Sequence, residues 1–354
     1  MKISKKINNV RREAMRFITK NIGSSQKASN KMMDDPTQIK LILICRPNAR
    51  LGNLLLITPL IKEVSAVFPE AQIDLFVKGG LMPIILKNYN QIGEIIVLPK
   101  KPFSDLVAYL KVWLKIERKK YDLAINVDKD SSSGRLAVER SHAAFKFYGD
   151  DLNEIESKAN DYLHIAKYPV YNFRNFLKSV SVETRNLPIS EMDLKLDATE
   201  LAHGKEILKD KFDNQKPTIA IFTFATGDKC FSESWWKDFY ELLKIKYERD
   251  YNILEVLPVE NVSQIQFKAT SFYSKDVREI ASVLANTVLF IGADSGIMHL
   301  ANASHIPTVG LFSGLNIQKY QPYGFGSVAI DTNTIVSKNQ YIVIIDEILL
   351  KNSQ

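Results

Sequence analysis

The chain has few cysteines and no long apolar run. Cys45 and Cys230 are the only cysteines among 354 residues, and they fall in or beside predicted strands in different halves of the chain. This pattern argues against a disulfide or a cysteine-based metal site and fits a reducing cytoplasm. No stretch of roughly 18 apolar residues occurs, so no transmembrane helix is expected. The basic N-terminus lacks the apolar core and cleavage site of a secretory signal.

Two groups of sequence motifs are also absent. No G-x-G-x-x-G follows the first predicted strand, and the turn from Arg46 to Gly52 is poor in glycine, which disfavours a dinucleotide-dependent dehydrogenase. Nothing resembles the aromatic and basic platforms or the modules that bind nucleic acid, so no nucleic-acid partner is expected.

What is present is an ordinary globular composition, 45% hydrophobic and 25% charged, in a chain long enough for two domains. The net charge of +7 predicts anionic partners without choosing among them. Residues 1–31 carry nine basic side chains against one acid, Glu13, and their apolar residues recur on one face of a helix at Ile3, Ile7, Val10, Ala14 and Phe17. Such a helix can lie on an anionic membrane surface. It fits equally a helix packed on the protein body or a partly disordered arm.

From Leu41 onward the chain alternates apolar strands with amphipathic helices in two similar series, joined by a linker around 213–217. In the first series strands are predicted at 41–45, 72–77, 94–98 and 122–127, with helices near 53–67, 80–88 and 103–119. In the second, strands are predicted at 218–223, 252–257, 288–292 and 308–312, with helices near 232–247, 276–285 and 296–304. This alternation predicts an α/β fold with parallel sheets. Residues 130–197 are less regular and suit loops and helices around an acceptor, and a final helix over about 339–351 is expected to pack back on the body.

The most informative segment runs from Phe290 to Ala301, with the sequence FIGADSGIMHLA. It predicts a strand, a polar turn and a helix, followed by a strand at 308–312, and parallel units of this kind bind ligands beyond the carboxyl ends of their strands. There Ser295 would offer a hydroxyl, Gly296 would allow close approach, and the helix N-terminus would face a phosphate. Asp294 and His299 would lie beside them. The same Asp-Ser-Gly sequence could serve only as an N-cap.

This segment, with Pro307 and Leu311-Phe312 behind it, resembles the D-[ST]-G-x-x-H-x-A signature of glycosyltransferase family nine, the heptosyltransferase-like enzymes. The resemblance implies the GT-B architecture, in which two Rossmann-like domains with parallel sheets face a central cleft. We therefore expect a basic amphipathic segment at 1–40, an acceptor domain at 41–212, a nucleotide-sugar donor domain at 213–335, and a C-terminal helix at 336–354.

The segment that follows the first strand resembles the family pattern R-x-x-x-x-G-D-x-x-x-x-T-P-L, which assigns Arg46, Arg50 and Gly52 to the acceptor side. The aspartate of that pattern is the family's proposed general base, and here the position holds Asn53. An amide can orient an acceptor hydroxyl, but it cannot take its proton.

Another carboxylate would therefore have to substitute as the base. Asp128 and Asp130, after the fourth predicted strand, are the nearest candidates by topology. Each of them also fits a turn-forming acid that caps the next helix. Their D-x-D spacing is that of a metal-binding motif, but they lie in the acceptor half, and the resemblance implies no metal.

On the donor side, residues 223–229, with the sequence TFATGDK, resemble the family's hydroxyl-rich phosphate loop. Thr223, Thr226 and Lys229 would supply hydroxyls and an ammonium to a pyrophosphate. Glu260, after the next strand, fits a family glutamate on the nucleoside side better than Glu255, which is expected to face away. Without the family, the loop is a simple turn and Glu260 a solvated carboxylate.

The resemblance implies an inverting glycosyltransferase without a cofactor, which uses a nucleotide-diphosphate sugar, ADP-linked and heptose-like, and a lipopolysaccharide-core or lipid-linked saccharide acceptor. Such an enzyme would be cytoplasmic, and peripheral at the inner face of the cytoplasmic membrane if residues 1–31 bind lipid. The alternative is a non-catalytic nucleotide-sugar or saccharide-binding relative that lost its general base at Asn53.

Overall fold

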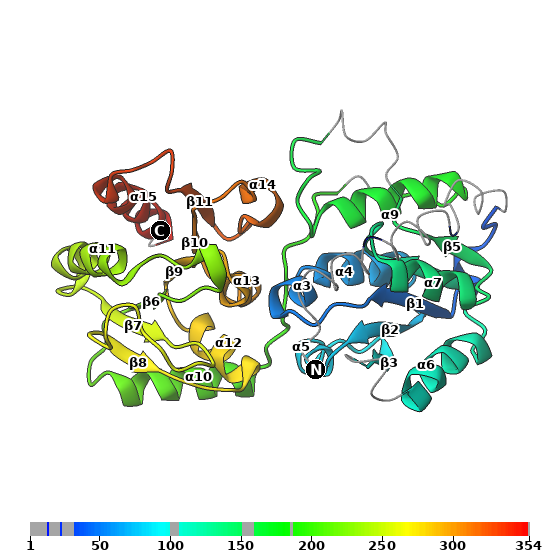
Figure 1. The fold of residues 1–354 in the computed structure, drawn as a ribbon, viewed down its shortest axis with the longest axis horizontal. Helices are drawn as coiled ribbons and strands as arrows, with labels where there is room; N and C mark the ends of the chain where they lie inside the picture. The colour runs from blue at the N-terminus through cyan, green and yellow to red at the C-terminus, as the bar shows by residue number, and fades with distance from the viewer. Residues whose placement is uncertain are drawn as a thin grey trace. The chain divides into compact units, whose positions relative to one another are not determined.

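The computed structural model describes residues 32–99, 106–150, 159–184 and 187–352, together with Glu13 and Ile22. The amphipathic pattern predicted over residues 1–31 lies otherwise outside these residues. By their contacts the described residues form two compact units (Figure 1). Unit 1 draws on residues 1–49, 59–83 and 89–190, and unit 2 on residues 50–58, 84–88 and 191–354.

Unit 1 is built on a five-stranded sheet in the order β3-β2-β1-β4-β5, in which every neighbouring pair is parallel. The strands are β1 (Leu41–Arg46), β2 (Gln72–Lys78), β3 (Ile92–Leu98), β4 (Leu123–Asn126) and β5 (Phe145–Phe147). The helices are α4 (Thr58–Val67, from its second residue), the start of α5 (Met82–Ile85), α6 (Leu106–Arg118), α7 (Ser132–Arg140) and α9 (Tyr168–Ser179). A 3-10 turn, η1 (Pro36–Gln38), precedes β1.

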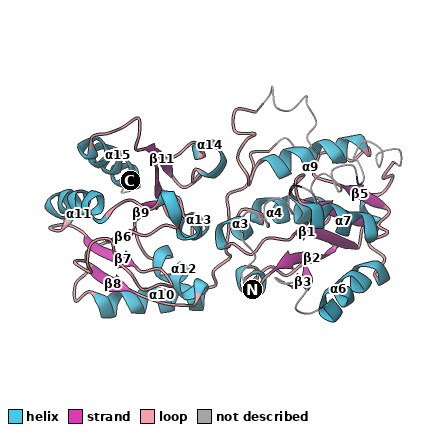
Figure 2. Ribbon diagram, in the orientation of Figure 1, coloured by secondary structure: helices cyan, strands magenta, loops and turns pink. Residues whose placement is uncertain are grey.

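Unit 2 is built on a six-stranded parallel sheet in the order β11-β10-β9-β6-β7-β8. The strands are β6 (Thr218–Phe222), β7 (Asn252–Val256), β8 (Thr270–Phe272), β9 (Leu289–Ala293), β10 (Thr308–Phe312) and β11 (Val328–Asp331). The helices are α3 (Leu51–Leu55), α10 (Ala198–Lys211), α11 (Glu233–Tyr247), α12 (Val277–Ala285), α13 (Gly296–Ala303), α14 (Ile317–Tyr320) and α15 (Lys338–Asn352), with a 3-10 turn, η3 (Gly227–Lys229). Figure 2 shows how strands and helices alternate along both units.

The predicted fold class, an α/β chain with two parallel sheets, is confirmed. Strands such as β1, β6 and β9 are almost entirely buried apolar runs, as expected where helices cover both faces of a parallel sheet. The core of unit 2 includes a group of aromatic side chains between its sheet and the helices α11 and α15, with Trp236, Phe239 and Tyr341 at its centre.

Two features differ from the prediction. The helix predicted over 53–67 is two helices, α3 and α4, because Pro59 has no N–H to continue the first one; the Thr58 hydroxyl instead donates to the Leu55 carbonyl, 2.8 Å away. The boundary between the units also differs, because the long C-terminal part of unit 2 begins at Glu191 and not after residue 212. Helix α10 belongs to unit 2 because Gly204 lies directly against the backbone of Ser282 in α12.

Candidate functional site

Unit 2 has a cavity of about 380 Å³ at the carboxyl ends of β6, β9 and β10. Parallel sheets characteristically bind ligands at this edge. The lining comes from the turn after β6, from the end of β9 and from the loop after β10: Thr226, Asp228, Lys229, Asp294, Leu311, Phe312, Ser313, Gly314 and Asn316. The cavity therefore brings together three of the predicted donor residues, Thr226, Lys229 and Asp294.

Lys229 and Asp294 form an ion pair at this cavity. The Lys229 Nζ donates to Asp294 Oδ2, and the carboxylate is buried whereas the lysine is about half exposed. The same Nζ lies 5.3 Å from the centroid of the Tyr320 ring on α14, within the range of a cation–π contact. Asp294 and Tyr320 therefore hold the ammonium at the cavity, and its remaining protons can be donated to a bound anion.

Ser295, Gly296 and His299 are not among the residues that line this cavity. The Ser295 hydroxyl caps α13 by accepting from the Met298 N–H at 3.2 Å, as in the alternative N-cap interpretation. Gly296 lies against α3, since a Cβ built on it would stand 3.3 Å from Leu51 Cβ. His299 is buried, and its ring centroid lies 6.2 Å from that of Tyr320.

Thr223 is turned toward a buried carboxylate rather than toward the cavity. Its hydroxyl donates to Glu255 Oε1 at 2.6 Å and accepts from the Gln264 N–H at 3.1 Å. Ser263 donates to the other oxygen of Glu255 at 2.8 Å. Burial raises the pKa of Glu255, while these two hydroxyls act in the opposite direction.

Glu255 is buried within β7 and does not line the cavity, and the sequence did not predict the contact of its carboxylate with Thr223. The apolar run 252–257 concealed it, since a charged residue inside a buried strand gives no sign of which face it occupies. Glu260, the preferred candidate, is an exposed residue in the turn after β7. Tyr320 is a second residue that sequence reasoning missed, because the four-residue helix α14 has no periodicity to reveal it.

Asn53 lies on α3, within unit 2, and is half-buried. Arg50 is exposed and occupies the N-cap position of the same helix. Gly52 is buried, and a Cβ built on it would stand 2.7 Å from His299 Cδ2. The first predicted motif and the His299 helix thus meet in one unit.

Arg46, Asp128 and Asp130 lie in unit 1, at the carboxyl ends of β1 and β4. The buried Arg46 donates through Nη1 to Asp128 Oδ2 at 2.8 Å, and Asp128 Oδ1 accepts from the Asp130 N–H at 3.1 Å. Asp128 therefore forms a turn and an ion pair, but it does not cap the next helix, because Ser131 is the N-cap of α7. Asp130 is exposed.

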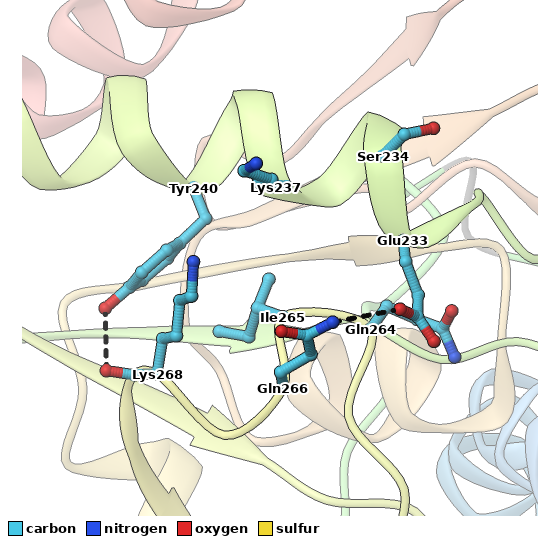
Figure 3. Close-up of a pocket in the computed structure, with 8 residues that line it drawn as sticks. All are labelled: Glu233, Ser234, Lys237, Tyr240, Gln264, Ile265, Gln266 and Lys268. Carbon is cyan, nitrogen blue, oxygen red and sulfur yellow. Dashed lines mark hydrogen bonds between the residues drawn. The ribbon is translucent and has the colours of Figure 1, made fainter.

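Unit 2 has a further cavity of about 210 Å³ between α11 and residues 264–268 (Figure 3). Tyr240 donates to the Lys268 carbonyl at 3.2 Å, and Gln266 donates to Glu233 at 3.4 Å. Gln264 also lines this cavity, and its N–H binds Thr223. The Thr223–Glu255 pair is thereby connected to the wall of this second cavity.

Neither a metal cluster nor a spanning helix is found in the described part of the chain. No three His, Cys, Asp or Glu residues gather there as ligands of one ion. No helix there combines the length and apolar character that crossing a bilayer requires.

Residues 109–341 match the sequence profile of Glycosyltransferase family 9 (heptosyltransferase). The chain belongs to this family. It is therefore a glycosyltransferase, and the predicted enzyme class is confirmed.

The chain also resembles individual glycosyltransferases in sequence and in fold. The chain is 23% identical over 295 residues to lipopolysaccharide heptosyltransferase 3 of Escherichia coli K12, covering 77% of this chain and 82% of that protein. A family 9 glycosyl transferase from Veillonella parvula has a similar fold, with a TM-score of 0.71 and 16% identity over 90% of this chain and 99% of that one. The E. coli heptosyltransferase WaaC with ADP gives a TM-score of 0.60 and 15% identity over 87% and 99%.

Proposed function

We propose that this family 9 enzyme transfers a heptose-like sugar, with inversion, from an ADP-linked sugar to a lipopolysaccharide-core or lipid-linked saccharide. The single observation that carries the proposal is the cavity at the carboxyl ends of β6, β9 and β10, where Lys229 is held by Asp294. The names of the relatives, a lipopolysaccharide heptosyltransferase and a heptosyltransferase with ADP, support this donor and acceptor.

In the proposed reaction an acceptor hydroxyl displaces the nucleoside diphosphate from the sugar in line. Negative charge then grows on the departing pyrophosphate, and the groups that stabilise it there lower the barrier. The Lys229 ammonium and the Thr226 hydroxyl would do this, and their position in the lining of the cavity supports the assignment. Asp294 acts through Lys229 by fixing its position.

The other donor residues have narrower proposed roles. The Ser295 hydroxyl already caps α13, so Ser295 and Gly296 would act through the N-terminus of that helix. His299 supports the contact between α13 and α3. Thr223 would fix the loop through Glu255, and Glu260 remains the proposed contact on the nucleoside side.

We also propose a location at the inner face of the cytoplasmic membrane, where a saccharide-lipid acceptor would be presented. The nine basic residues among 1–31 support it, because anionic lipid attracts such segments.

The test is the affinity for ADP and for ADP-heptose, measured by calorimetry on wild type and Lys229→Ala. The variant loses a charge-assisted hydrogen bond of about 1.5–3 kcal/mol, so its affinity for each ligand should fall by about 10- to 150-fold. Lys209→Ala, at an exposed lysine of α10, is the matched control and should bind as wild type does. Unchanged affinity in Lys229→Ala would remove the basis of the proposed donor site.

A further inference from the structure

Helix α6 of unit 1 is fixed to the protein by one of its faces. Trp113 and Ile116 are buried in a core cluster that includes Phe76 and Ile96, and the Trp113 ring centroid lies 5.6 Å from that of Phe76. Tyr109, one turn earlier, packs against Trp113 at 5.9 Å between ring centroids. This inner face orients the helix firmly.

Two lysines of the same region tie the helix to the neighbouring strands. Lys115 pairs with Glu94 of β3. Lys119, just beyond the helix end, donates to the buried carboxylate Asp74 of β2 at 2.5 Å and lies 3.2 Å from Glu94. These lysines are accounted for by the fold.

The outer face of α6 is apolar where a surface helix would normally be polar. Leu106, Val107, Leu110 and Leu114 have relative exposures of 56%, 64%, 52% and 47%. Their spacings of three and four residues place them on one stripe of the helix. Soluble proteins rarely expose large contiguous apolar patches, and those that they do expose commonly mark interaction sites.

Cations border this stripe. Lys111 follows Val107 by one turn and Arg118 follows Leu114 by one turn, so both lie along its edge. Both are exposed, and neither has an ion-pair partner among the residues that the structure describes. An apolar stripe beside unpaired Lys and Arg is the arrangement by which a helix lies in a membrane interface, with the apolar side chains among the acyl chains and the cations at the phosphates.

We propose that the outer face of α6, defined by Leu106, Val107, Leu110, Leu114, Lys111 and Arg118, docks on an anionic phospholipid bilayer. The charge of Lys111 and Arg118 selects a membrane over a neutral protein surface as the occupant. This surface includes none of residues 1–31 and is independent of the donor sugar, so the proposal can fail while the proposed transfer activity stands.

The experiment measures binding of the full chain to vesicles of phosphatidylcholine mixed with phosphatidylglycerol, and to phosphatidylcholine alone. Replacing Lys111 and Arg118 by Gln should weaken binding to the mixed vesicles by about 30-fold, which corresponds to about 1 kcal/mol per cation. Replacing Leu110 and Leu114 by Gln should weaken it by at least about tenfold, because their apolar area no longer leaves water.

Matched controls lie in unit 2. Ile245→Gln removes an isolated exposed apolar residue of α11, and Lys209→Gln with Lys211→Gln removes two exposed cations of α10; these variants should bind vesicles as wild type does. Thermal unfolding is measured for every variant to test whether the fold is kept.

The proposal is overturned if the α6 variants bind mixed vesicles with wild-type affinity. It is also overturned if the control variants lose as much binding as the α6 variants. It is also overturned if wild type sediments as a dimer that the Leu110 and Leu114 replacements dissociate, because a second copy of the chain would then cover this face.

Discussion

Gly52 lies so close to His299 that a Cβ on the glycine would stand 2.7 Å from the imidazole Cδ2. On the other side of the same contact, a Cβ on Gly296 would stand 3.4 Å from the Gly52 nitrogen. The two glycines let the backbone of α3 meet the N-terminus of α13. This explains in steric terms why both motifs, distant in the sequence, contain a glycine at these positions.

Gly52→Ala should therefore destabilise the protein by about 1–3 kcal/mol, the usual cost of overfilling a packed site. The added methyl group must displace the His299 ring, which is buried and has little room to move. The free energy of unfolding in urea measures the effect. Gly80→Ala is the control, because a Cβ there meets nothing within 4 Å, and it should change stability little. Equal stability of the two variants would show that the contact is loose.

Most of this architecture could be predicted from the sequence, because long apolar runs that alternate with amphipathic segments have few other solutions. β6, β9 and β10 are found within one residue of their predicted bounds. β5, β8 and β11 were missed because three or four residues carry no readable period. The helices within residues 130–197, α7 and α9 among them, were expected as a group but could not be placed.

The site was harder to predict than the fold, because side-chain direction depends on tertiary contacts. The loop 223–229 correctly pointed to the sheet edge, yet only Thr226 and Lys229 of its predicted residues line the cavity. Thr223 turns to Glu255, since a buried carboxylate needs hydrogen-bond donors more than a solvated phosphate site does. No sequence pattern indicates whether the Thr223 hydroxyl will bind a buried carboxylate or face the cavity.

Glu200 of α10 should stabilise unit 2 in a pH-dependent way. Hydrogen bonds from the buried Arg278, at 2.5 and 2.7 Å, hold the pKa of Glu200 well below its usual range. The stabilisation is therefore complete above about pH 4.3, the usual glutamate pKa, and is lost as the pH falls through the lower folded-state value.

Glu200→Gln should lower the free energy of unfolding at pH 7 by about 3–5 kcal/mol, because it leaves a buried guanidinium without its carboxylate. The difference from wild type should shrink steadily as the pH is lowered below about 4. Glu206→Gln, at an exposed position of the same helix, should behave as wild type at every pH. A difference that stays constant with pH would argue that Glu200 acts by packing and not by charge.

The basic segment should contribute to binding of anionic vesicles. Arg135 donates to the Ile22 carbonyl at 3.0 Å, so the segment is better neutralised than deleted. Replacing Arg11, Arg12 and Arg16 by Gln should weaken vesicle binding by about two orders of magnitude, at about 1 kcal/mol per cation, with unfolding unchanged. Replacing Lys205, Lys209 and Lys211 of α10 by Gln is the matched control. Wild-type vesicle binding by the arginine variant would return residues 1–31 to a role in packing.

Asn53 stands at the position to which the resemblance assigns the proposed general base. Rate measurements on variants can separate two possible consequences of this amide. If another carboxylate takes the acceptor proton, Asn53→Ala should lose little rate, whereas loss of the true base should cost about 10²- to 10⁴-fold. Asp128→Asn is an ambiguous test, because it also leaves the buried Arg46 without its ion pair. Asp130 is exposed, so Asp130→Asn gives the cleaner measurement.

The decisive variant is Asn53→Asp, assayed with the ADP-sugar donor saturating and with a series of saccharide-lipid acceptors. We propose that Asp128 or Asp130 serves as the base. Asn53→Asp should then change the rate little, whereas replacing the true base by Asn should lower it by about 10²- to 10⁴-fold. If Asp128→Asn does not fold, its thermal unfolding will show this, and Asp130→Asn then remains as the test of the substitute base. If instead Asn53→Asp raises transfer by about 10²- to 10⁴-fold while neither aspartate variant alters the rate, the substitute base does not exist. The chain would then be a family member whose transfer is slow because an amide stands where a proton must be accepted.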